Sequence, residues 1–344
     1  MEYYAGIDVS LEASSVCVVD ASGKIVREAK VASDPQALTL FFGEVGCELT
    51  RIGIEACPLS QWLHAGLSAA GFAVVLLEVR HVKAAISAMA VKTDRNDARG
   101  IAQLLRMGWY RPVHCKSQSS QDVRALLTAR KQLLVKAIDV ELCLRGLLRG
   151  YGLKMGQTTD VRFSARVREL AAGHPVLEQL SEAILRARDV LRKEIAALHR
   201  QLLAIARSDN VCRHLMTVPG VGALTALTFK TAVDDPTRFT SSKRLGAHFG
   251  LTPRKYQSGT VDITGSITKA GDAMVRSALY EAAHSMLTRA KSFSSLKRWA
   301  MSVAKRRGLR RATVALARKL AIVLHRMWMN GTDFRFGKEE AVAA

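Results

Sequence analysis

The order of strand-like and helix-like segments in the N-terminal third is the feature that most constrains the fold. Alternating apolar and polar residues predict strands, while apolar residues three or four apart predict helices. On these criteria the sequence predicts helices at 35–46 and 61–70, and strands at 3–9, 16–20, 25–31, 51–56 and 72–79. Three strands therefore meander before the first crossover, which is the order of an α/β domain with a mixed sheet.

A second constraint is the segment K-T-D-R-N-D-A-R at 92–99, which follows these strands. Thr93 is suited to cap a helix, and Asp94 and Asp97 would then share one helix face, three residues apart. Two neighbouring carboxylates repel each other unless a cation lies between them. A helix start with solvated acids gives the same pattern, so this segment alone leaves both interpretations open.

Two further acids favour the metal interpretation. Asp8 is predicted on the first strand and Glu55 on the fourth, and each is flanked by apolar residues, where an unpaired charge is costly. A ribonuclease-H-like sheet brings its first strand, its fourth strand and a later helix together at one edge. We therefore expect Asp8, Glu55, Asp94 and Asp97 to form a divalent-metal site; the alternative is buried acids paired with Arg or Lys. Oxygen ligands without His or Cys favour magnesium or manganese over zinc.

The start of the chain also admits a nucleotide-binding interpretation. G-I-D-V-S at 6–10 followed by a hairpin resembles the first phosphate loop of sugar kinases and actin-like ATPases, which share this sheet order. Those proteins have a glycine where Val9 stands. They also carry a second phosphate loop and a glycine-rich adenosine motif. This sequence lacks both, so the sequence disfavours ATP binding.

Charge points to the class of partner. The 344-residue chain carries a net charge of +21. Such an excess attracts polyanions, above all nucleic acid, with an acidic membrane surface as the competing partner. The sequence has no run of about eighteen apolar residues, no signal peptide and no lipidation motif, so no membrane association is expected. Six scattered cysteines without zinc spacing predict reduced thiols in a cytoplasmic protein.

The middle of the chain is predicted to be helical. A long basic amphipathic pattern covers 123–150, and a second helical pattern covers 177–205 with apolar residues at heptad-like spacing. This spacing predicts an antiparallel or intermolecular coiled coil. A helical hairpin packed on its own domain is the alternative, and either structure would serve as a spacer or an assembly element.

The last third carries the residues expected to contact nucleic acid. V-P-G-V-G at 218–222 is a glycine turn that opens a helix and resembles the turn of helix-hairpin-helix modules, which directs backbone N–H groups at phosphate. Ten Lys or Arg and no acid lie between 291 and 319. The predicted contacts are Gly220, Gly222, Arg254, Lys255, Lys269, Arg276, Lys305, Arg306, Arg307, Arg310 and Arg311.

These motifs, in this order, resemble those of one family. G-I-D, I-E-A, K-T-D-R-N-D-A, V-P-G-V-G, L-T-P-R-K-Y-Q-S-G and T-K-A-G-D are similar to motifs of the DEDD-type transposases of bacterial insertion sequences, the bridge-RNA-guided recombinases. The resemblance extends from Tyr4 to about Trp328. One departure is Glu55-Ala56-Cys57-Pro58, where many members read E-A-T-G. The glutamate is retained, but the residues that set the backbone path after it differ.

The resemblance implies a domain order and a chemistry. It implies a RuvC-like catalytic domain at 1–115, a helical coiled-coil region at 116–208 and a C-terminal, mainly helical transposase domain at 209–344. The four acids would hold Mg²⁺, with Mn²⁺ as a substitute. Ser258, which composition alone would assign to a turn, would be the nucleophile. A covalent serine–DNA intermediate conserves bond energy, so no ATP would be required.

The resemblance also implies the partners. These are donor and target DNA, a non-coding guide (bridge) RNA that reads sequence by base pairing, and further copies of the chain in a dimer of dimers. The protein would act in the bacterial cytoplasm, at the nucleoid. Two alternatives remain open: a RuvC-like structure-selective endonuclease that uses water and leaves no protein–DNA adduct, and a non-catalytic nucleic-acid-binding protein without metal dependence.

Overall fold

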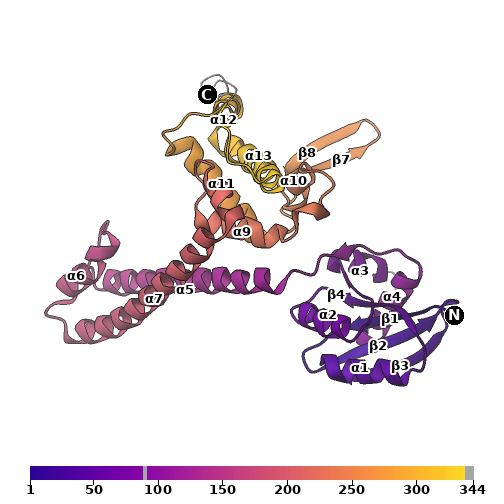
Figure 1. Ribbon diagram of the computed structural model, residues 1–344. Helices are drawn as coiled ribbons and strands as arrows, with labels where there is room; N and C mark the ends of the chain where they lie inside the picture. The colour runs from indigo at the N-terminus through magenta and orange to yellow at the C-terminus, as the bar shows by residue number, and fades with distance from the viewer. Residues whose placement is uncertain (88–90, 338–344) are drawn as a thin grey trace. The chain divides into compact units, whose positions relative to one another are not determined.

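The computed structural model describes residues 1–87 and 91–337. The chain divides into two compact units, Met1–Lys116 and Ser117–Ala344. The first is built around a β-sheet and the second is mainly helical (Figure 1). An α/β part followed by a helical part agrees with the predicted fold class. The three-domain division itself stays a prediction, and residues 338–344 of its last domain lie outside the described part.

The sheet of the first unit has the strand order β3-β2-β1-β4-β5-β6. β2 pairs antiparallel with β1 and with β3, whereas β4 runs parallel to both β1 and β5. This confirms the predicted mixed sheet in which three strands meander before the first crossover. The strands are β1 (Tyr3–Asp8), β2 (Ala13–Asp20), β3 (Ile25–Ala32), β4 (Leu49–Glu55), β5 (Val74–Leu77) and β6 (Pro112–Val113).

Helices cover both faces of this sheet. Helices α1 (Pro35–Glu44) and α2 (Ser60–Ala69) pack on the face that carries Ile7 and Ile54. Helix α4 (Asp94–Arg106) packs on the opposite face, where Cys17 contacts its alanines. The alternation of side chains along each strand produces these two apolar faces.

One helix of this unit was not predicted. Helix α3 (Val79–Ile86) begins where the predicted strand 72–79 was expected to end, and β5 is only four residues long. Val79, Val82 and Ile86 have the three- and four-residue spacing of a helix, but Val79 follows the apolar run 72–77 after a single Glu78, so it also fits the strand pattern. The prediction therefore placed the strand end too late.

Two long helices open the second unit. Helices α5 (Gln118–Gly150) and α7 (Pro175–Ser208) pack against each other, and α6 (Asp160–Ala171) covers their far end. At that end Arg188 is buried, stacks on Phe163 and donates hydrogen bonds to Glu141 and Asp160. The other end of the pair, including Leu202, joins the C-terminal core. This packing matches the predicted alternative of a helical hairpin on its own domain, while the coiled coil stays a prediction.

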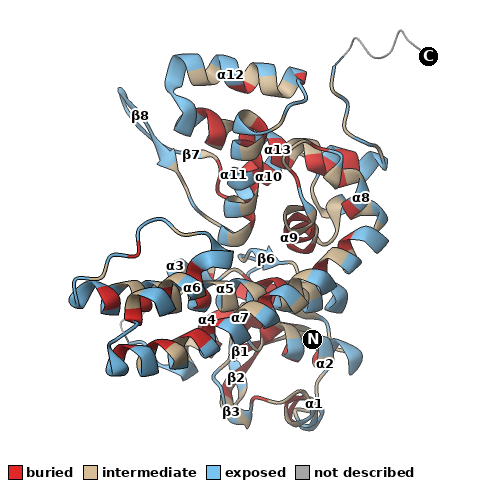
Figure 2. Cartoon of the chain, turned by 90° about the vertical axis from the view of Figure 1, so that its left-hand side faces the viewer, coloured by how far each residue is buried: buried red, intermediate tan, exposed pale blue. Residues whose placement is uncertain are grey.

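The C-terminal helices surround one apolar core, seen as the buried residues of the central helices in Figure 2. Helix α13 packs against both α11 and α12, and Phe229 meets Phe249 edge to face inside. Among the described residues, no helix combines the length and apolarity needed to span a bilayer. The elements are α8 (Asn210–Met216), α9 (Ala223–Val233), η1 (Pro236–Arg238), α10 (Arg244–His248), β7 (Pro253–Ser258), β8 (Val261–Ile267), α11 (Ala273–Thr288), α12 (Ser295–Arg307) and α13 (Leu309–Asn330).

Candidate active site

Two glycines let helix α4 lie directly on the sheet beside the predicted acids. β1 and β4 run parallel with Gly6 opposite Gly53, and both glycines face α4. A Cβ atom on Gly6 would lie 2.2 Å from the carbonyl oxygen of Ala98, and one on Gly53 would lie 2.6 Å from a leucine methyl carbon of the same helix. Two residues further along each strand, and therefore on the same face, come Asp8 and Glu55.

The other two acids lie at the start of α4. Thr93 is the N-cap, as predicted, and its hydroxyl oxygen accepts a hydrogen bond of 3.2 Å from the backbone N–H of Asn96. Asp94 and Asp97 occupy the first turn, where the helix dipole favours negative charge. Side chains three residues apart share a helix face, so these two carboxylates lie together.

Electrostatic coupling shows that acids from three elements are close to one another. The pKa of Asp8 is raised to about 6, first by desolvation and then by the charges of Asp97 and Asp94. Desolvation also raises the pKa of Glu55, with Asp8 and Asp97 adding to the shift. Lys92 opposes both shifts. The structure therefore brings all four predicted acids to one sheet edge, with Asp8 coupled to the other three.

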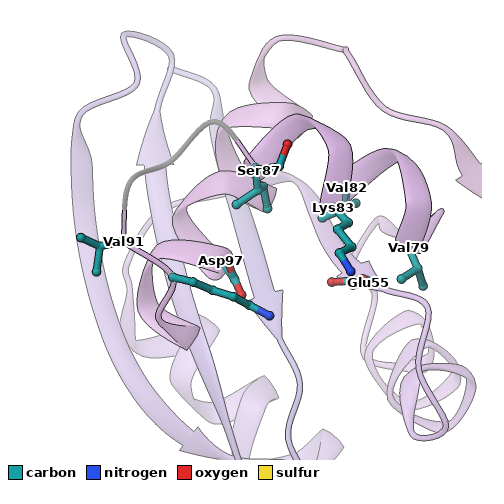
Figure 3. Close-up of a pocket in the computed structure, with 9 residues that line it drawn as sticks. Glu55, Val79, Val82, Lys83, Ser87, Val91 and Asp97 are labelled. Carbon is teal, nitrogen blue, oxygen red and sulfur yellow. The ribbon is translucent and has the colours of Figure 1, made fainter.

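A cavity of about 430 Å³ is lined by two of these acids, Glu55 and Asp97. Figure 3 shows Lys83 reaching from α3 toward the carboxylate of Glu55, while Asp97 points into the same space from α4. The remaining lining residues are largely apolar: Val79, Val82, Ile86, Ser87, Val91 and Lys92. Apolar walls lower the local dielectric, so charges in this cavity interact more strongly than they would in water.

Sequence reasoning missed these two lysines. Lys92 is the first residue of the K-T-D-R-N-D-A-R segment, but its role was not predicted. Lys83 carries no sequence signal, because it belongs to helix α3, which the sequence does not predict. Both place positive charge beside acids that would otherwise only repel each other.

An ion-pair cluster on β3 fixes the helix that carries two of the acids. Glu28 accepts hydrogen bonds from Arg95 Nε at 2.7 Å and from an Arg99 Nη at 2.8 Å. These hydrogen bonds lower the pKa of Glu28 to about 2, and the bond from Arg99 has the larger effect. Within K-T-D-R-N-D-A-R the arginines thus anchor α4 to the sheet while the aspartates face the site. Sequence reasoning gave the arginines no role, because their partner lies far away in the chain.

The donor set suits a hard divalent cation. Asp8, Glu55 and Asp97 are partly buried, whereas Asp94 is exposed. Carboxylates that repel one another are ligands that magnesium and manganese prefer. Across residues 1–87 and 91–337, however, no three Asp, Glu, His or Cys side chains already form a metal-binding group. The backbone therefore brings the acids to one edge, while the described side chains do not yet form a coordination shell.

Ser258 lies in the second unit, so it does not share a unit with the acids. It is the last residue of β7, and its backbone pairs with Val261 of β8. The hairpin was not predicted, because exposure of the whole of β7 leaves no buried alternation to detect. Tyr256 pairs with Ile263, so these two and the Ser258–Val261 pair share one face of the hairpin. Ser258 therefore stands on an exposed strand rather than within a turn.

The glycine turn before a helix is present as predicted. Gly222 is the N-cap residue of α9, and Gly220 has a φ of +87°. A Cβ atom on Gly220 would lie 2.4 Å from the carbonyl oxygen of Ala282 in α11. Close packing therefore accounts for Gly220, and a phosphate contact at this turn stays a prediction.

The predicted basic contacts differ in their surroundings. Arg254 and Lys255 are exposed on β7, and Lys269 has a φ of +55°. Arg276 donates hydrogen bonds from Nη1 to the carbonyl oxygens of Ala270 and Gly271 at 2.6 and 3.0 Å, so part of its guanidinium holds the loop before α11. A compact exposed group lies where α12 meets α13: Lys305, Arg306, Arg307, Arg310 and Arg311.

Two family models match most of the chain. A DEDD transposase model of the IS110 type, described as "Transposase", matches residues 5–153, which contain all four acids. A second model, described as "Transposase IS116/IS110/IS902 family", matches residues 212–300, which contain Ser258.

Whole-length relatives carry the same description. The chain is 30% identical over 338 residues to the transposase for insertion sequence element IS1111A of Coxiella burnetii, covering 96% of this chain and 91% of the relative. It is 28% identical over 294 residues to a probable family 20 transposase of Pseudomonas aeruginosa, covering 83% of this chain and 86% of the relative. Thermus thermophilus RuvC, solved with a Holliday junction substrate, aligns with a TM-score of 0.27 and 17% identity over 33% of this chain and all of RuvC. The chain belongs to the IS110/IS116 family of DEDD transposases.

Proposed function

We propose that this transposase moves an insertion sequence by cleaving and rejoining DNA strands, with Mg²⁺ held by the four acids and with Ser258 as the nucleophile. The observation that carries the proposal is that the charges of Asp8, Glu55 and Asp97, which come from three elements, interact, and that Glu55 and Asp97 line one cavity. Family membership supports DNA as the substrate.

The first unit would prepare the scissile phosphate. When bound, a divalent cation supplies charge stabilisation at the phosphate and lowers the pKa of an attacking hydroxyl. Asp8, Glu55, Asp94 and Asp97 would hold it in their ionised form. Lys83 and Lys92 line the same cavity and would attract and orient the phosphate by their charge.

The second unit would supply the nucleophile. Ser258 Oγ attacks phosphorus and loses its proton, one P–O bond forms, and the bond from phosphorus to a sugar oxygen breaks. The released sugar oxygen takes up a proton. The serine phosphodiester retains the energy needed to join a second strand, so no ATP is consumed. Exposure of Ser258 on the hairpin supports access to so large a substrate.

The proposed partners are donor and target DNA and a guide RNA, bound by a homo-oligomer arranged as a dimer of dimers. The net charge of +21 and the exposed basic group at the junction of α12 and α13 support binding to phosphate backbones. Base pairing by the RNA would then supply sequence specificity, and the protein would recognise duplex shape. The mass of the RNA-bound complex in solution tests the assembly.

A search for a covalent adduct tests the chemistry. Protein, its copurifying RNA, Mg²⁺ and supercoiled donor and target DNA are combined, and the products are separated on a denaturing gel. We expect a protein–DNA adduct that maps by peptide digestion to Ser258. It should be lost in Ser258→Ala, in Asp8→Ala and in the presence of EDTA.

Matched variants separate chemistry from folding. Ser266→Ala changes another exposed serine of the same hairpin, and Glu48→Gln removes an exposed carboxylate of the first unit outside the site. Both should form the adduct at the wild-type level. Cut DNA without an adduct would instead assign a water-using endonuclease, the alternative function, and full activity of Ser258→Ala would exclude the covalent mechanism.

A further inference from the structure

The second unit contains a cavity that the proposed chemistry does not use. It has a volume of about 810 Å³ and lies between α12, α13 and the chain that follows α13. That segment is held in place by two hydrogen bonds of 2.9 Å: the Phe334 N–H donates to Thr217 Oγ1, and the Ser295 N–H donates to the carbonyl oxygen of Phe336. The segment after α13, which forms one wall of the cavity, is therefore fixed in position. The volume is within the range of small-ligand pockets, roughly 300–1,000 Å³.

Positive charge surrounds this cavity. Four exposed cations line it: Lys243, Lys319, Arg326 and Arg335. Within the described part of the chain, none of the four has a carboxylate within ion-pair distance. The cavity has one acidic lining residue, Asp333, whose carboxylate is bonded to His214 at 2.7 Å. Four cations around one hollow, with no ion-pair partner among residues 1–87 and 91–337, favour an anionic ligand.

Aromatic side chains form part of the lining. Trp299 and Phe334 are both half-buried and packed against the C-terminal core, which fixes their rings. The Lys319 Nζ lies over the Trp299 ring, 3.8 Å from its centroid, so a base that stacks on this face would displace the ammonium toward the phosphates. Aromatic rings flanked by cations are the combination with which proteins bind single-stranded nucleic acid, since the rings stack on bases and the cations follow the phosphates.

We propose that this cavity binds an unpaired nucleotide of a DNA or RNA strand, with its base against Trp299 and Phe334 and its phosphates between Lys319 and Arg326. A base-paired nucleotide is excluded from such stacking because its faces are covered by neighbouring base pairs. The inference rests on the proposed function only in taking nucleic acid as the partner. It assigns to this cavity the capture of a strand that has left its duplex.

Oligonucleotide binding by the full chain tests this assignment. Fluorescein-labelled twelve-nucleotide oligo-dT, oligo-U and a duplex of equal length are titrated in EDTA, and anisotropy gives each dissociation constant. Trp299→Ala and Arg326→Gln should each weaken single-strand binding roughly tenfold. Duplex binding should change less than about twofold, because exposed basic residues elsewhere carry it.

Control variants distinguish a loss of binding at the cavity from a loss of folding. Arg298→Gln removes another exposed cation, which lies on α12 and does not line the cavity, and should leave single-strand binding unchanged. Trp299→Phe keeps a stacking ring and should retain most of the affinity. Arg326→Gln should also lower the slope of log affinity against log salt by roughly 0.7, whereas Arg298→Gln should not.

Each outcome has one meaning. Stronger loss with oligo-U assigns the cavity to RNA, and stronger loss with oligo-dT assigns it to a DNA strand. Wild-type single-strand binding in both Trp299→Ala and Arg326→Gln, or equal losses with duplex, would refute the assignment. Because the assay contains no divalent metal and requires no cleavage, a missing Ser258 adduct would leave its result intact.

Discussion

The surroundings of Asp8 change the pKa of its side chain. It ends a strand beside three other acids, and its pKa of about 6 is well above the ordinary value for an aspartate. A raised pKa means that folding favours the protonated form, so ionised Asp8 lowers stability at neutral pH; this cost shrinks as the pH falls below about 6 and is gone below the ordinary value of 3.8. A bound cation would remove the same repulsion without protonation.

Asp8→Asn should therefore separate stability from activity. Asparagine has nearly the shape of aspartate but no charge, so the unfolding free energy in EDTA should rise by about 1 kcal/mol, which is a few degrees in melting temperature. Mg²⁺ should raise the melting temperature of the wild type more than that of the variant. Thermal unfolding with and without Mg²⁺ measures both effects, and a lower melting temperature of Asp8→Asn in EDTA would contradict them.

Glu28→Gln should alter how stability depends on pH. The depressed pKa of Glu28, about 2, means that its ion pairs stabilise the fold above the unfolded value near 4.5 and are lost as the pH falls toward 2. At pH 7 the variant should lose about 1–2 kcal/mol of unfolding free energy. That difference should shrink on acidification.

Urea denaturation between pH 7 and pH 3 measures this effect. Glu44→Gln is the matched control, because the Glu44–Arg27 pair is 3.2 Å long but Glu44 is 68% exposed. Such exposed pairs contribute about 0–1 kcal/mol, so the control should show little change at any pH. A pH-independent loss in Glu28→Gln would show that packing, rather than charge, holds Arg95 and Arg99.

At the scale of elements, the contact of α4 with β1 and β4 decides where the acids meet. Gly6 and Gly53 are opposite each other and both lie under this helix. With any larger residue the helix would stand further from the sheet, and Asp94 would move away from Asp8.

Gly6→Ala should consequently damage both the fold and the site. Its Cβ atom would lie 2.2 and 2.4 Å from backbone atoms of Ala98 and Ala102, which can move only if the helix moves. We expect a loss of about 3 kcal/mol in unfolding free energy, at the upper end for overpacked cores, together with lost DNA cleavage. In the control Gly43→Ala, the new atom would meet nothing within 4 Å, and stability should rise slightly.

The elements also show which parts of the protein a sequence can predict. The three-stranded meander, the α4 N-cap and the strand positions of Asp8 and Glu55 were predictable, because buried faces impose a period and caps have fixed chemistry. Helix α3 and the β7–β8 hairpin were missed: the first continues an apolar run, and the second is exposed along its length. The pairing of Glu28 with Arg95 and Arg99 could not be predicted, since it requires knowledge of which strand lies beside α4.

For the whole molecule, the excess of positive charge should be visible in the salt dependence of DNA binding. The exposed group Lys305, Arg306, Arg307, Arg310 and Arg311 contributes five of the 51 basic residues. Replacing all five with glutamine should reduce the slope of log affinity against log salt by about 4.5, if each neutralises one phosphate. Replacing the four arginines with lysine keeps the charge and should leave the slope unchanged. Duplex binding at several salt concentrations distinguishes these results.

The division of the chain between Lys116 and Ser117 has a genetic consequence. Each unit has its own apolar core, so a substitution that unfolds the first unit need not disturb the second. If the second unit binds nucleic acid as proposed, such a lesion would leave a protein that still occupies its substrate but cannot cut it. Defective copies of the gene would then act as dominant inhibitors of intact ones in the same cell. Mutations that inactivate the encoded protein would in that way reduce the movement of the insertion sequence that carries the gene.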